Sequence, residues 1–179
     1  MARQALKAAG NISRVSQRAS ALSPSGIRKF FDLLSSIEGV ISLGVGEPDY
    51  ATPWRIREAA INSLENGQTM YTSNQGTPEL RAALAGYLKN MYGLCYDPAT
   101  ELLITVGVSE AMDLAMRALL NPGDEVIMPA PCYVAYPAAV MLSGGTPVIV
   151  PTTAEHGFEI EPGDIEDSIT ENTKAIFIG

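Results

Sequence analysis

The chain has 179 residues, of which 46% are hydrophobic and 18% charged, a composition typical of a globular protein and unlike a disordered or fibrous one. No run of about 18 apolar residues occurs, so we expect no membrane-spanning helix and no membrane partner. The net charge of −8 argues against a nucleic-acid partner, which would need a basic face. The two cysteines, Cys95 and Cys132, suggest neither a disulfide framework nor a metal site, and a reducing cytoplasm fits best.

The N-terminal segment is basic, because no acidic residue precedes Asp32. Such a segment resembles an organelle transit peptide, or it is an arm that packs on a partner subunit. We favour the arm, because residues 25–38 already have the pattern of a folded helix. Their apolar side chains recur on one face, and Gly39 follows where a C-terminal cap belongs.

Two further helices are predicted before residue 100. Thr52-Pro53 is a helix start, with threonine as the cap and proline at the first helical position, and Gly67 ends that helix. Thr77-Pro78 repeats the arrangement, and Gly93 ends the second helix.

From residue 102 onward, short apolar runs alternate with helical patterns. This alternation predicts a mainly parallel sheet with helices on both faces, an α/β fold. In such sheets ligands bind outside the carboxyl ends of the strands, so the loops there are the places to search. The predicted strands are 102–106, 126–128, 147–150 and 175–178, and the predicted helices are 109–120, 133–143 and 162–169.

The segment 107–111 follows a predicted strand and opens a helix. Backbone N–H groups at a helix N-terminus bind phosphate well, and Ser109 adds a hydroxyl, although an ordinary cap explains the segment equally well. The same Gly-x-Ser-x-Ala pattern also resembles the nucleophile elbow of a serine esterase. That reading needs an acid and a histidine downstream, and the only candidates are Asp124 and His156.

Three loops carry weaker signals. Tyr133 follows the strand 126–128 and is placed to stack on a flat heteroaromatic ring or merely to pack. Gly46 lies in a glycine-rich segment where backbone can approach a ligand closely, or where the chain simply turns. Tyr71 stands in a polar loop before the second helix and is able to hydrogen-bond a phosphate, or to remain on the surface.

The order and spacing of these segments together resemble the class I/II aminotransferases, which are fold-type I enzymes that use pyridoxal 5′-phosphate (PLP). The resemblance runs from about Ser25 to Gly179. It rests on the motifs Leu43-Gly44-x-Gly46-Glu47-Pro48-Asp49, Tyr71-(x)4-Gly76-x-x-Glu79-Leu80-Arg81, Gly107-x-Ser109-Glu110-Ala111, Asn121-Pro122-Gly123-Asp124-Glu125-Val126 and Pro131-x-Tyr133-x-x-Tyr136.

The resemblance implies roles for individual residues. Val108 and Ser109 would bind the PLP phosphate, chiefly through backbone N–H groups, and Tyr133 would stack on the pyridine ring. Tyr71 would reach the PLP phosphate of the neighbouring subunit in a homodimer. The backbone of Gly46 would lie beside the substrate carboxylate, and the resemblance places Ile27 at the substrate entrance.

The resemblance also implies an organisation and a reaction. Residues 1–45 would form an N-terminal arm and a small-domain segment, and residues 46–179 an incomplete N-terminal part of the large PLP-binding domain. The full-length protein would transfer an amino group between an amino acid and a 2-oxo acid, although lyases, synthases and non-catalytic modules share the fold. The Schiff-base lysine would follow Gly179, so we expect residues 1–179 to be a truncated, inactive fragment with an exposed apolar edge at 175–178.

Overall fold

The computed structural model describes residues 14–23, 39, 46 and 48–179. The chain divides into two compact units, one made of Met1–Ser25 and Gly107–Gly179 and the other of Gly26–Val106. The expected boundary between residues 45 and 46 stays a prediction. In the described ranges, no helix is both long and apolar enough to cross a membrane.

The unit Gly26–Val106 contains two helices, α4 (Trp54–Glu65) and α5 (Pro78–Tyr92). The caps of α5 are as predicted: Thr77 Oγ1 accepts a hydrogen bond from Leu80 N, and Gly93 ends the helix in the left-handed conformation at φ +70°. The predicted threonine cap of α4 is wrong. Pro53 occupies the cap position and no side chain accepts a hydrogen bond from the first turn, because proline offers no acceptor there.

The predicted strand at 102–106 is wrong. This segment belongs to no ladder, although Ile104 N donates to Gln75 O at 3.1 Å. It lies at the end of the unit Gly26–Val106, whereas the sheet lies in the other unit. Within this run, Ile104 contacts Gln75 and Gly76 in the loop before α5, whereas Leu103 and Val106 are 51% and 89% exposed.

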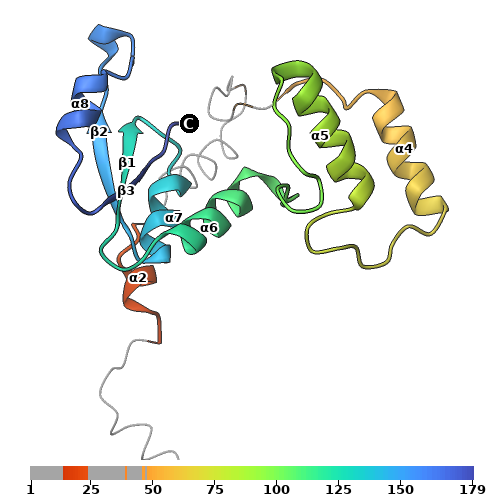
Figure 1. Ribbon diagram of the computed structural model, residues 1–179, viewed down its shortest axis with the longest axis horizontal. Coiled ribbons are helices and arrows are strands. Elements are labelled where there is room, and N and C mark those ends of the chain that lie inside the picture. The colour runs from red at the N-terminus through yellow and green to blue at the C-terminus, as the bar shows by residue number, and fades with distance from the viewer. Residues whose placement is uncertain (1–13, 24–38, 40–45, 47) are drawn as a thin grey trace, which may run out of the picture. The chain divides into compact units, whose positions relative to one another are not determined.

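The unit that contains residues 107–179 is built on a parallel sheet of three strands in the order β2-β1-β3 (Figure 1). The strands are β1 (Glu125–Ala130), β2 (Thr146–Pro151) and β3 (Thr173–Ile176). Each was predicted within a few residues, and β3 begins two residues earlier than expected because its pairing starts at Thr173, opposite Glu125.

Helices cover both faces of this sheet, as predicted. Helices α6 (Gly107–Leu119) and α7 (Ala135–Ser143) pack on the face that carries Val126 and Met128. Helix α8 (Pro162–Asp167) packs on the other face, where Ile165 meets Ile127. The three β1 side chains are fully buried, and each contributes about 1.5–3 kcal/mol by leaving water.

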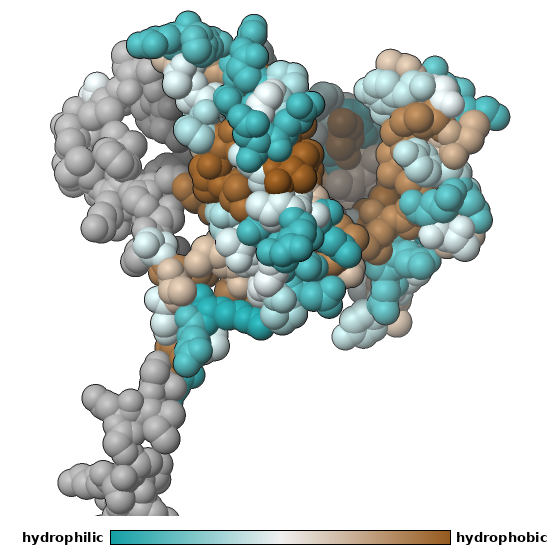
Figure 2. All heavy atoms as spheres, turned by 60° about the vertical axis from the view of Figure 1, so that its left-hand side comes forward, coloured by the Kyte–Doolittle hydropathy of each residue, from teal (hydrophilic) through white to brown (hydrophobic). Residues whose placement is uncertain are grey.

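Two shorter elements complete this unit. The helix α2 (Gln17–Ser20) lies against α7, where the Arg18 guanidinium donates to the carbonyl of Leu142 at 3.5 Å. A 3-10 turn, η1 (Ala154–His156), follows β2. Apolar atoms bordered by hydrophilic ones remain on the surface of this unit (Figure 2), and Ile176 and Ile178 of the predicted apolar edge are 45% and 65% exposed.

Candidate functional site

The candidate site begins at the carboxyl edge of the sheet. All three strands are parallel, so the loops that follow Ala130, Pro151 and Ile176 leave from the same edge. Thr152 joins two of them, because its backbone N–H and its hydroxyl both donate to the carbonyl of Ala130, at 2.7 and 2.9 Å. This bridge holds the start of the loop that carries Tyr133.

Aromatic rings support one another beside this edge. Tyr133 meets Tyr136 edge to face, with ring centroids 5.5 Å apart, and Tyr136 packs on Phe177 at 4.6 Å. Tyr136 and Phe177 are partly buried against the core, whereas Tyr133 is 54% exposed. The inner rings therefore fix the position of Tyr133 while part of its surface stays open to a ligand.

A cavity of about 100 Å³ opens among these loops. Its lining includes Cys132, Thr152, Phe158 and Phe177. Pockets that bury a small-molecule ligand usually measure about 300–1,000 Å³. This cavity is therefore too small to enclose a cofactor-sized ligand by itself.

The first turn of α6 carries the predicted phosphate-binding pair. Gly107 adopts φ +78°, and a Cβ added there would meet no atom within 4 Å, so glycine is needed for its conformation and leaves open space. Val108 is 68% exposed, and Ser109 is also exposed. First-turn N–H groups have no acceptor within a helix, and the helix dipole adds positive potential there, so this turn suits an anion.

The direction of α6 places its first turn, with Val108 and Ser109, away from the amino end of the sheet. The helix ends at Leu119, and Asn121–Asp124 leads directly into β1, where Asp124 accepts a hydrogen bond from Asn121 N. A helix of 13 residues spans about 20 Å, so its first turn lies at the far end from this connection.

The other predicted site residues belong to the unit Gly26–Val106. Tyr71 lies in the loop between α4 and α5, in the other unit, with its side chain fully exposed. Gly46 is exposed and has open space around its Cβ position. Ile27 lies outside the described residues.

The serine-esterase reading is inconsistent with this topology. Asp124 precedes β1 at the amino end of the sheet, whereas His156 follows β2 at the carboxyl end. A strand of six residues spans about 20 Å, too far for the hydrogen bond that joins the acid and histidine of a triad.

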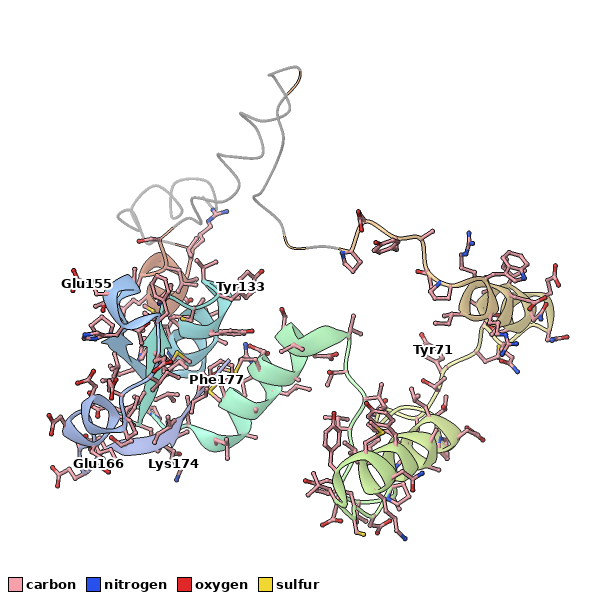
Figure 3. All side chains as sticks on the ribbon, turned by 90° about the horizontal axis from the view of Figure 1, so that it is seen from above. Tyr71, Tyr133, Glu155, Glu166, Lys174 and Phe177 are labelled. Carbon is pink, nitrogen blue, oxygen red and sulfur yellow. The ribbon has the colours of Figure 1, made fainter. Side chains whose placement is uncertain are left out.

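Lys174 also lies away from this edge. It stands near the amino end of β3, between the residues that pair with Glu125 and Val126, and it is exposed. Figure 3 shows it well apart from Tyr133. Across the described part of the chain, no group of His, Cys, Asp and Glu is arranged to hold a metal ion.

Sequence reasoning missed two contributors to the carboxyl edge of the sheet: Phe177 and Thr152. Phe177 lies just beyond β3 and Thr152 just beyond β2, and their roles depend on contacts with residues far along the chain.

Comparison with known proteins places this arrangement in a family. Residues 38–179 match the model for "Aminotransferase class I and II". The chain is 57% identical over 157 residues to "Putative aminotransferase YugH" of Bacillus subtilis (strain 168), covering 88% of this chain and 41% of that protein. It is 43% identical over 164 residues to "Aromatic-amino-acid aminotransferase 2" of Thermococcus litoralis, covering 92% of this chain and 42% of that protein.

Solved structures agree with the sequence relatives. The aspartate aminotransferase of Thermus thermophilus with maleate superposes with a TM-score of 0.83 at 38% identity, over 92% of this chain and 44% of that one. The chain therefore spans about two fifths of the length of the curated relatives it matches.

Proposed function

The chain belongs to the class I and II aminotransferase family, with the N-terminal part of the PLP fold type I, and from that premise we propose that its full-length protein is a PLP-dependent aminotransferase. It transfers an amino group between an amino acid and a 2-oxo acid. The observation that carries the proposal is the half-exposed Tyr133, held by Tyr136 at the carboxyl edge of the sheet.

The residues present fit the phosphate and the flat ring of PLP. The first turn of α6 offers the N–H groups of Val108 and Ser109, with open space at Gly107, where a dianionic phosphate would be stabilised. Tyr133 offers a supported aromatic surface to a planar heteroaromatic ring.

Bound PLP supplies an electron sink for the charge that develops at the substrate α-carbon. The residues of this chain bind and orient. Val108 and Ser109 would hold the phosphate end, and Tyr133 would pack against the ring. The partly buried Tyr136 and Phe177 exclude water from beneath Tyr133 and keep its ring from rotating away.

We further infer that the enzyme is a homodimer in which Tyr71 donates a hydrogen bond to the phosphate in the neighbouring subunit. Its fully exposed side chain is consistent with a contact outside its own unit. In the same assignment, the exposed backbone at Gly46 lies beside the substrate carboxylate and Ile27 at the substrate entrance.

The proposal is tested on the purified full-length enzyme. We expect a visible PLP absorbance band and amino transfer to 2-oxoglutarate from one of several donors, among them aspartate and aromatic amino acids. Loss of ammonia or of a side-chain fragment without transfer to the 2-oxo acid would show a lyase. Absence of any PLP band would refute the cofactor assignment.

The Tyr71→Phe variant tests the contact between subunits. Losing one hydrogen bond to a charged group costs about 1.5–3 kcal/mol, which corresponds to roughly 10- to 150-fold weaker PLP binding. PLP affinity is measured by equilibrium titration of the apoenzyme, and the dimer is checked by analytical ultracentrifugation. An unchanged affinity would remove Tyr71 from the site.

A further inference from the structure

Arg81 is the buried charged residue of the described structure. It lies on α5 and is 7% exposed. Its Nη1 atom donates to Gln75 Oε1 at 3.3 Å, to the carbonyl of Ala99 at 3.2 Å and to the carbonyl of Pro98. Its Nε is buried without a hydrogen-bond partner among the described residues. Burying a guanidinium costs free energy, which points to a structural role for the contacts that Arg81 makes.

The first segment that Arg81 holds is the loop that carries Tyr71. Gln75, at the end of this loop, contacts Arg81 through its side chain and Ile104 through its carbonyl, at 3.1 Å from Ile104 N. The next residue, Gly76, lies so close to Ile104 that an added Cβ would be 2.5 Å from its Cγ1 atom. The loop is therefore fixed where it enters α5.

The second segment is the turn at 97–101, which has its own internal bracing. Asp97 accepts hydrogen bonds from Ala99 N at 2.9 Å and from Thr100 Oγ1 at 2.8 Å, and Glu101 Oε2 accepts one from Asp97 N at 2.7 Å. The hydrogen bond from Ala99 N contributes most to lowering the pKa of the Asp97 carboxyl below its ordinary value. This bracing holds the Pro98 and Ala99 carbonyls towards Arg81.

We propose that Arg81 is a positioning residue that clamps the Tyr71 loop to the 97–104 segment and so sets where the Tyr71 hydroxyl meets the PLP phosphate. This inference rests on the proposed function of Tyr71. Tyr71 is fully exposed, so its position depends on the ends of its loop.

Arginine suits this task because its planar guanidinium fixes where Nη1 lies and the directions in which its N–H groups point. Lysine carries the same charge, but its ammonium group rotates freely at the end of a shorter side chain, so it does not hold the acceptors of Nη1 in the same places. The Arg81→Lys variant therefore separates the position of the donors from the charge itself.

The test is a double-mutant cycle on the full-length holoenzyme. The affinity for PLP is measured by equilibrium titration for the wild type, Arg81→Lys, Tyr71→Phe and the double variant. We expect Arg81→Lys to weaken PLP binding about 10-fold, as for one misplaced hydrogen bond to a charged group, and to add nothing in the Tyr71→Phe background. The control is Arg117→Lys, which alters an exposed pair with Asp113 on α6 and should leave PLP affinity unchanged.

The outcomes distinguish this inference from the proposed function. If Tyr71→Phe alone leaves PLP affinity unchanged, the proposed role of Tyr71 fails. If Tyr71→Phe weakens binding while Arg81→Lys does not, or if the two effects multiply, Arg81 does not act through Tyr71 and the inference is overturned.

A second variant keeps the test decisive if Arg81→Lys does not fold. Gln75→Ala removes the loop side of the clamp while leaving Arg81 its two carbonyl acceptors. We expect weaker PLP binding that also disappears in the Tyr71→Phe background. A full effect in that background would overturn the inference.

Discussion

Gly76 occupies a position at which both conformation and space exclude a side chain. Its φ of +92° lies in the region that L-residues rarely adopt, and Gly76→Ala would place a Cβ 2.5 Å from Ile104 Cγ1 and 2.6 Å from Ile104 Cβ. The conformation costs roughly 1–2 kcal/mol. Crowding in a packed site typically adds about 1–3 kcal/mol. We therefore expect Gly76→Ala to lower the free energy of unfolding by about 2–5 kcal/mol.

The assay is native-state hydrogen exchange at the Ile104 amide, which donates to Gln75 O and so reports the opening of this contact. The matched control is Gly67→Ala. Gly67 has φ +71° but open space around its Cβ position, so it isolates the conformational cost.

A further variant tests the steric part of the argument. Ile104→Ala removes Cγ1 but keeps the Cβ that lies 2.6 Å from the added atom, so we expect it to rescue Gly76→Ala only in part. Equal losses of stability in Gly76→Ala and Gly67→Ala would refute the reasoning, because the close approach of Gly76 to Ile104 would then contribute nothing.

Three other predictions follow from the described structure. Met128→Ala, at a fully buried position in β1, should lower the free energy of unfolding by about 2–5 kcal/mol in urea titrations, and a loss below 1 kcal/mol would contradict the packing. The pKa of the Asp97 carboxyl is lower in the folded protein than its ordinary value of 3.8. The ionised carboxylate therefore stabilises the 97–101 turn fully at pH values above 3.8, and this stabilisation is lost as the pH falls through the pKa of the folded state. The protection factor of the Ala99 amide should fall in that range, and Asp97→Asn should abolish the pH dependence. Residues 1–179 alone should not transaminate with added PLP, because Lys174 lies away from the carboxyl edge; turnover above the free-PLP background that disappears in Lys174→Ala would show this to be wrong.

Local signals predicted the helices from α4 to α8 well, whereas the helix predicted at 25–38 lies outside the described residues. The start and end of α5 follow from Thr77 and Gly93, because a cap is formed by atoms within one turn of the helix. The cap of α4 was missed for an equally local reason, since Pro53 and not Thr52 takes the position that needs an acceptor.

Contacts between distant segments could not be read in the same way. An apolar run at 102–106 has the composition of a strand, yet a ladder needs a partner, and this run instead meets the loop before α5. The support of Tyr133 by Phe177 likewise depends on β1 and β3 lying side by side. The resemblance identified Tyr133 as a candidate, and only the fold indicates what holds it.

The strand order β2-β1-β3 also bears on how the chain folds. The residue that pairs with Glu125 lies about 20 positions later in β2 but almost 50 positions later in β3. Closing the longer loop costs roughly 0.7 kcal/mol more in chain entropy. The β1-α7-β2 unit therefore has the lower nucleation cost, and it is complete while β3 is still being synthesised. On a ribosome, β1 would leave one of its edges unpaired until β3 emerges, and that interval is when an aggregation-preventing chaperone would have most to protect.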